Sequence, residues 1–281
     1  MKKINTKICK IALSAMLLGL TAGSAQAAAL IYEPFSQTAG DLNGQAGGTG
    51  LSGNWSRNST VTVVESPTLS YGDLQNTGGQ VNLPSSSGVD AWVATTTVLG
   101  DNNLLTNSAT LWFSFMFRPT GSGGSTNEKG GFGFGTERLD GYYNGLNMIN
   151  SGNGVGCSVN AYTLEAATWS GGGNASMTGS LPLPQNTSTL IVGKIEWGTL
   201  DTDDERITMY TPSTTNLVTL GTSISRTVAG FDQSVLDTVS FTARGQEDDQ
   251  TYDEIRFGAT YADVSPQSAP PAPTGTMIII K

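Results

Sequence analysis

The 281-residue sequence contains no histidine. Catalysis by Ser-His-Asp or Cys-His groups needs an imidazole base, so this absence excludes those mechanisms. It also disfavours a zinc or iron centre, because imidazole is the commonest protein ligand of such metals. Any catalysis would have to rest on aspartate, glutamate or tyrosine side chains.

The amino-terminal segment has the composition of a secretory signal peptide. It runs from the basic MKKINTKICK through the apolar IALSAMLLGL to Ala25-Gln26-Ala27, an A-x-A cleavage motif. The apolar run of about ten residues is shorter than the roughly 20 that a membrane-spanning helix needs. We therefore expect residues 1–27 to be removed, and a mature chain that begins near Ala28 and has no integral membrane segment. Its destination would be the periplasm, the cell surface or the extracellular space.

Basic residues are scarce. The chain has 14 lysines and arginines against 23 acidic residues, and removing residues 1–27 takes away four lysines. The mature chain then has 10 basic residues against 23 acidic ones, a formal net charge of −13. Such a surface repels nucleic acid and anionic lipid, which are therefore not expected as partners. Neutral glycans and cations remain candidates.

Cysteine is nearly absent as well. Cys9 lies in the predicted signal peptide, which leaves Cys157 alone and excludes an intramolecular disulfide in the mature chain. In the segment VGCSV, Cys157 alternates with Val155 and Val159. This spacing predicts a packed strand residue rather than a reactive thiol.

Helical periodicity does not occur in any window, whereas alternation with period two is frequent. Phe113, Phe115 and Phe117 share one face of ATLWFSFMFRP, and about a dozen similar short runs are separated by Gly, Asn, Asp and Pro turns. This pattern predicts an all-β sandwich that forms one domain over residues 28–264, followed by a proline-rich tail at 265–281. We expect long loops at 40–55, 120–131 and 163–179.

Two acidic segments, 200–206 and 246–254, each precede an apolar strand. Asp201, Asp203 and Glu205 fall at alternate positions and, with Asp253, are candidate calcium ligands. In the second segment, strict alternation places Glu254 and Arg256 on one face, which suits a cross-strand ion pair, and places Asp253 beside Ile255 and Phe257. If that face is the core, Asp253 needs backbone donors or a cation. The simplest alternative is that both segments are solvated turns that protect strand edges.

Several aromatic residues are candidates for stacking on sugar rings, because indole and phenol rings combine a flat apolar face with a polar group. The candidates are Trp112, Tyr142, Tyr143 and Trp169. Trp169 and the two tyrosines are expected in loops, and Trp112 is expected on the side of its strand opposite to Phe113.

Three segments carry a family resemblance: LIYEPFSQTAGDLNGQAGGTGLSGNW, LIVGKIEWGTLDTDDERITMYTP and YDEIRFGATYADV. Together they resemble the secreted concanavalin-A-like, laminin-G-like jelly-roll proteins of bacteria, which often carry a PEP-CTERM sorting signal. The resemblance implies two antiparallel sheets packed face to face, with the last strand beside the first. The tail SAPPAPTGTMIIIK lacks the spanning apolar segment and the final arginine cluster of that signal, so retention by that route is not expected.

Laminin-G-like domains mostly bind glycans, proteins or calcium, so the resemblance implies no reaction. We therefore expect a secreted, non-catalytic module that binds a polysaccharide or surface glycan, or that belongs to the extracellular matrix or cell surface. One alternative is a glycoside hydrolase or polysaccharide lyase of the same fold that uses Asp253 or Glu254. A second is a purely structural surface protein. The sequence predicts no oligomeric state.

Overall fold

A computed structural model of the chain describes residues 28–65, 68–84, 88–120, 129–138, 152–160, 162–169, 176–200, 202–213, 217, 219–228, 230, 232–244 and 249–267. Within these residues the only helical elements are α1 (Val98–Asp101), α2 (Tyr261–Val264) and the short 3-10 helix η1 (Gln233–Val235). None of the described helices is long and apolar enough to cross a bilayer.

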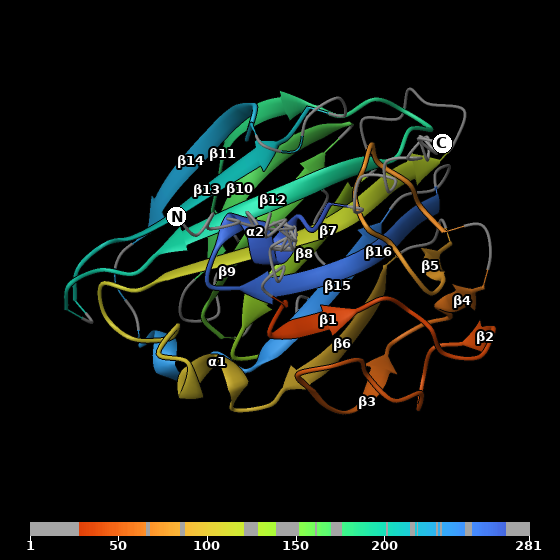
Figure 1. The fold of residues 1–281 in the computed structure, drawn as a ribbon, viewed down its shortest axis with the longest axis horizontal. Helices are drawn as coiled ribbons and strands as arrows, with labels where there is room; N and C mark the ends of the chain where they lie inside the picture. The colour runs from red at the N-terminus through yellow and green to blue at the C-terminus, as the bar shows by residue number, and fades with distance from the viewer. Residues whose placement is uncertain are drawn as a thin grey trace, which may run out of the picture.

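The described strands form two antiparallel sheets that stack as layers (Figure 1). Nine of the described strands form the first sheet, which β1 (Ile31–Glu33) joins by pairing with β16. The other eight follow in the order β14 (Thr222–Val228), β13 (Glu205–Thr211), β12 (Thr189–Glu196), β7 (Thr110–Thr120), β16 (Asp249–Gly258), β5 (Gln80–Leu83), β4 (Thr62–Val64) and β2 (Gly40–Asp41). Strand β16, the last described strand, thus pairs with β1, the first.

The second sheet has seven described strands. Their order is β11 (Ser176–Pro182), β10 (Thr163–Trp169), β9 (Gly154–Asn160), β8 (Lys129–Gly135), β15 (Thr238–Arg244), β6 (Val89–Thr95) and β3 (Leu51–Arg57). This arrangement confirms the two-sheet antiparallel jelly-roll sandwich. The prediction of a long loop at 163–179 is wrong, because that segment contributes β10 and the start of β11. Part of the loop expected at 40–55 likewise forms β2 and β3.

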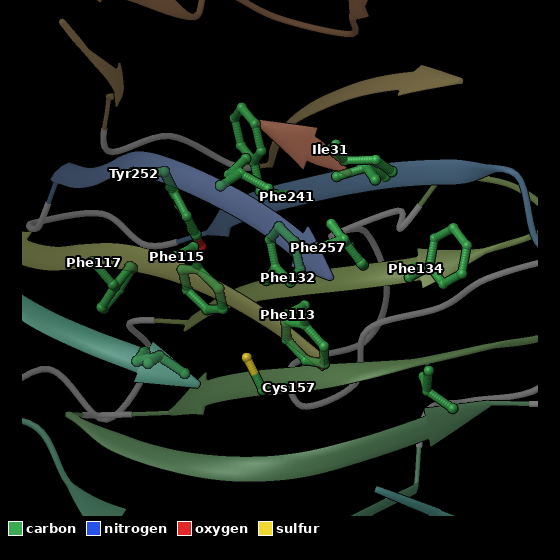
Figure 2. Packing of buried hydrophobic residues seen from close by; sticks show 14 of the residues in the cluster. Ile31, Phe113, Phe115, Phe117, Phe132, Phe134, Cys157, Phe241, Tyr252 and Phe257 are labelled. Carbon is green, nitrogen blue, oxygen red and sulfur yellow. The ribbon is translucent and has the colours of Figure 1, made fainter. Parts of the chain in front are cut away.

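Aromatic side chains fill the space between the two sheets (Figure 2). Phe113, Phe115 and Phe117 alternate along β7 and are buried, as their spacing predicts. Phe115 stacks on Phe132 of the opposite sheet with ring centroids 4.4 Å apart. Cys157 is buried in the same core, and burial raises the pKa of its thiol to about 12, so it is a packing residue.

One glycine in β12 makes room for this core. A Cβ atom on Gly193 would lie 2.0 Å from the Cζ atom of Phe113, whose register partner it is. The Phe113 ring therefore occupies the space that any larger residue at position 193 would need. This close approach explains why a glycine interrupts the apolar run of β12.

The nine-stranded sheet also has a smaller apolar cluster on its outer face, which we define as the face turned away from the second sheet. Met116, Leu190 and Val192 of this face pack with Val264 of α2. Ser114 of β7 donates from its Oγ to the Val264 carbonyl at 2.5 Å, which fixes α2 on β7. The helix thus covers the outer face next to β16, where the candidate site lies.

Candidate functional site

Strand β16 contains a bulge that decides which side chains reach its outer face. Tyr252 pairs with Phe117 and Asp253 with Met116, but the register then shifts, so that Arg256 pairs with Ser114. At the bulge, Glu254 has a left-handed φ of 54°. The bulge breaks strict alternation and leaves residues 253 and 256 on the same side of the strand.

The sequence-based placement of Asp253 is therefore wrong. Ile255 and Phe257 lie in the inner core together with Tyr252, whereas Asp253 pairs with Met116 of the outer cluster. Asp253 is nevertheless fully buried, and of the two alternatives, backbone donors or a cation, the described residues supply backbone donors. Its Oδ2 accepts a hydrogen bond from the Leu69 amide at 3.1 Å, and its Oδ1 accepts one from the Glu254 amide at 2.7 Å.

Asp253 is held in its neutral form. Burial raises the pKa of its carboxyl group to about 9, and the adjacent Glu254 carboxylate adds to the increase. The two backbone donors and Arg256 act in the opposite direction but do not offset burial. The ion pair in the cluster is instead formed by Glu254 and Arg256.

Glu254 and Arg256 form a buried ion pair within β16. The Glu254 carboxylate also accepts hydrogen bonds from the Thr77 amide at 2.6 Å and from the Tyr32 hydroxyl at 2.9 Å. Burial raises the pKa of Glu254 in spite of these partners. The Arg256 guanidinium lies 4.7 Å from the centroid of the Tyr32 ring, and its Nη2 donates to the Gln75 carbonyl at 2.6 Å.

Neither carboxyl group is placed for glycoside hydrolysis. A hydrolase needs two carboxyl groups that flank a cleft, about 5 to 9 Å apart and open to the substrate. Asp253 and Glu254 are both fully buried, and their hydrogen bonds go to this chain's own backbone and to Tyr32 and Arg256. The arrangement orients Arg256 and stabilises the bulge.

A pocket of about 330 Å³ opens above this network. Six residues supply most of its polar wall: Tyr32, Thr49, Gln75, Thr77, Arg256 and Asp263. Thr49, Gln75 and Thr77 are exposed, whereas Arg256 is only 3% exposed. The Nη1 atom of Arg256 is buried and has no hydrogen-bond partner among the residues that the structure describes. A buried donor without an acceptor is costly, which makes this atom the most informative feature of the pocket.

Asp263 contributes a second atom of this kind. It closes the capping box of α2, in which its Oδ2 accepts from the Thr260 amide at 2.7 Å and its own amide donates to Thr260 Oγ1 at 3.3 Å. Its Oδ1 is buried and accepts no hydrogen bond from any described residue. The Thr-x-x-Asp spacing at 260–263 is a capping-box signal that the sequence carries, whereas the pocket role of Tyr32 and Thr77 has no sequence signal.

The predicted aromatic ligand residues do not converge on this pocket. Trp112 lies on the outer face, as expected, but packs against Tyr210 and Tyr261 with ring centroids 6.2 and 5.8 Å away. The loop position expected for Trp169 is wrong: it lies in β10 and is 2% exposed. Its ring covers Gly154, where a Cβ atom would approach it to 2.4 Å. Tyr142 and Tyr143 lie outside the described residues.

The predicted calcium ligands are also dispersed. Asp203 Oδ2 accepts from the Leu200 amide at 3.0 Å, and Glu205 Oε2 accepts from the Gly198 amide at 2.7 Å, so both support the turn before β13. Asp253 lies on β16, which β12 and β7 separate from β13. Asp201 lies outside the described part of the chain, and within that part no three Asp, Glu, His or Cys side chains gather into a metal site.

Comparison with known proteins identifies no relative by sequence: neither a protein-family model nor a curated protein matches the chain. Solved structures with a similar arrangement include an endo-β-1,4-glucuronan lyase from the fungus Trichoderma reesei, with 13% identity and a TM-score of 0.46 over 83% of this chain and 100% of that one. A carbohydrate esterase from the Shiga toxin-encoding bacteriophage phi24B has 15% identity and a TM-score of 0.45, with 82% and 97% covered.

The carbohydrate recognition domain of Emp46p, in a metal-free form, has 10% identity and a TM-score of 0.43, with 72% of this chain and 87% of that one covered. These neighbours are carbohydrate-binding or carbohydrate-active β-sandwich proteins. At such identities and TM-scores the similarity carries no argument about the ligand of this chain.

Proposed function

We propose that this chain is a secreted, non-catalytic β-sandwich module that binds a neutral carbohydrate in the pocket beside Arg256. The observation that supports this proposal is the Nη1 atom of Arg256, which has no hydrogen-bond partner among the described residues and lies buried at the wall of a pocket whose other polar groups are hydroxyl and amide groups and the Asp263 carboxyl group. A ligand that brings a hydrogen-bond acceptor to Nη1 removes the cost of the orphan donor.

The charges around the pocket favour a neutral acceptor over an anionic one. The positive charge of Arg256 is already compensated by Glu254, with which it forms an ion pair. The chain as a whole is acidic, with 23 acidic against 14 basic residues, and repels polyanions. Sugar hydroxyls and ring oxygens accept hydrogen bonds without adding charge.

The walls and size of the pocket are compatible with a sugar. Exposed Thr49 offers a hydroxyl group that can both donate and accept, and Gln75 adds an amide. The Thr77 hydroxyl donates to the Tyr32 hydroxyl at 2.7 Å and can still accept a hydrogen bond. The volume of about 330 Å³ is at the lower end of the range of about 300–1,000 Å³ that is usual for small-molecule sites. We therefore expect recognition of a single or terminal sugar unit.

The test is a glycan array, followed by pull-down on insoluble polysaccharides, with a variant that fills the pocket. Thr49→Arg places a long side chain at the exposed wall and leaves the buried network untouched. Thr222→Arg, at an exposed position on β14 at the opposite end of the sheet, is the matched control. We expect at least a tenfold loss of affinity for Thr49→Arg and none for the control.

Equal binding by the two variants would show that the glycan binds elsewhere on the molecule. If the unaltered chain binds nothing on the array or on the polysaccharides, the proposed function is wrong and a structural surface role takes its place.

A further inference from the structure

The buried carboxylate of Asp263 lacks one hydrogen-bond donor. Asp263 is 5% exposed, lies at the pocket wall, and uses Oδ2 within the capping box of α2. Its Oδ1 has no hydrogen-bond partner in the described part of the chain. Buried carboxylate oxygens are normally satisfied by a donor, so a group that completes this one is expected nearby.

The segment that precedes β1 lines the same pocket as Asp263. Leu30 donates its amide hydrogen to the Phe257 carbonyl at 2.8 Å, so the chain just before β1 runs along the end of β16. Asp263 packs against Gly258, the last residue of β16. Its Cβ atom lies 2.4 Å from the position that a Cβ atom on Gly258 would take. Ala28 and Ala29 accordingly line the same pocket as Asp263.

The sequence predicts that Ala28 becomes the amino terminus. The A-x-A motif at residues 25–27 places the scissile bond between Ala27 and Ala28. A signal-type peptidase hydrolyses that bond with one water molecule, which leaves a carboxylate on Ala27 and an amino group on Ala28. An α-amino group has a pKa of about 7.7–8.0 and is mostly protonated at neutral pH. The single hydrogen of a neutral amide is thereby replaced by a cation with three donor hydrogens.

We propose that the α-ammonium group of Ala28 binds Oδ1 of Asp263, so that removal of residues 1–27 adds an ion pair to the pocket wall. The processed terminus is then a structural ligand of α2. It joins β1 to the helix that covers the outer face, and the folded state gains stability only once the chain has been cleaved. This inference holds whatever the pocket binds.

The test is a double-mutant cycle on the chain that begins at Ala28, which contains every described strand and helix. The unfolding constant is measured by chemical denaturation for the free amine and for the enzymatically Nα-acetylated chain. Both forms are then prepared again with Asp263→Asn, which keeps an acceptor for the Thr260 amide. Because Ala28 is exposed, we expect acetylation to raise the unfolding constant only about 3- to 10-fold with Asp263.

With Asp263→Asn we expect acetylation to change the unfolding constant by less than twofold. An equal effect of acetylation in both backgrounds, or no effect in the Asp263 chain, would overturn the proposal. If Asp263→Asn does not fold, Asp263→Ser, whose hydroxyl can also accept from Thr260, replaces it with the same expected result.

Discussion

The substitution Asp253→Asn tests the conclusion that a fully buried carboxyl group is neutral in the folded protein. Asparagine has nearly the same shape and cannot ionise, so it mimics the protonated acid. Asp253 binds its proton with a pKa of about 9 in the folded state, against 3.8 for the unperturbed group. The unfolded chain therefore releases this proton at a much lower pH than the folded chain does.

The sign and size of the effect follow from proton linkage. Between pH 4 and pH 9 the folded state holds one proton on Asp253 that the unfolded state does not, so the free energy of unfolding decreases as pH rises. The slope is about 1.4 kcal/mol per pH unit. From pH 5 to pH 8 the contribution of Asp253 to stability falls by about 4 kcal/mol, and above pH 9 it is lost in full.

The assay is urea denaturation of the unaltered chain and of Asp253→Asn at pH 5, 6.5 and 8. In the variant, the side-chain NH2 group faces one of the two backbone N–H groups that donate to the carboxyl group. This unfavourable contact lowers the free energy of unfolding by about 1–2 kcal/mol at every pH. The informative quantity is therefore the change with pH. Between pH 5 and pH 8 the unaltered chain should lose about 4 kcal/mol of unfolding free energy through Asp253, and the variant should lose none by this route. The variant should therefore gain about 4 kcal/mol relative to the unaltered chain over this range.

Asp41→Asn is the matched control. The hydrogen bond from Arg57 holds the pKa of Asp41 at about 2, so this group is ionised in both the folded and the unfolded state over the whole range of the assay. Its removal should leave the pH dependence between pH 5 and pH 8 unchanged. A stability difference for Asp253→Asn that is constant with pH to within 1 kcal/mol would refute the reasoning and mean that Asp253 is ionised when folded.

Three further substitutions test other parts of the structure by chemical denaturation. Gly193→Ala places a Cβ 2.0 Å from the ring of Phe113 and should lower the free energy of unfolding by about 1–3 kcal/mol, whereas a neutral result would mean that the ring moves aside freely. Trp169→Ala removes a buried indole and should lower the free energy of unfolding by about 3–5 kcal/mol without changing glycan affinity. A loss of glycan binding without this loss of stability would show that Trp169 contacts the ligand. Arg256→Met leaves the Glu254 carboxylate buried without its cation and should cost about 3–5 kcal/mol, and a cost below 1 kcal/mol would show that the pair is solvated.

The sequence was most informative where a strand is uninterrupted. Alternation placed Phe113, Phe115 and Phe117 on the core side of β7, because a strand without a bulge keeps a side-chain period of two. The same rule failed at Asp253, since one extra residue in β16 reverses the faces. The bulge residue is Glu254, and a glutamate with a positive φ has no signature comparable to a glycine at such a site.

Residues whose environment depends on distant segments were the least predictable. Trp169 precedes a glycine-rich stretch that suggests a loop, yet its indole packs over Gly154, 15 positions earlier in the chain. No sequence pattern indicates a role for Glu33. Its side chain is fully buried and accepts hydrogen bonds from the Gly48 amide at 2.8 Å and from Trp55 Nε1 at 2.9 Å. Such partners come together only through tertiary structure.

The bulge in β16 also explains why the candidate site lies where it does. In a regular strand, residues 253 and 256 point to opposite faces, and the guanidinium of Arg256 would not share a face with Asp253. The left-handed Glu254 costs of the order of 1 kcal/mol, and a buried ion pair such as Glu254–Arg256 adds little net stability, so packing alone does not favour the arrangement. The bulge holds the guanidinium of Arg256 between β1 and α2 at a surface pocket. Its Nη1 atom there has no hydrogen-bond partner among the described residues. Costly local geometry of this kind is a mark of binding sites, and it supports the proposal that the ligand binds at Arg256 rather than at the aromatic residues.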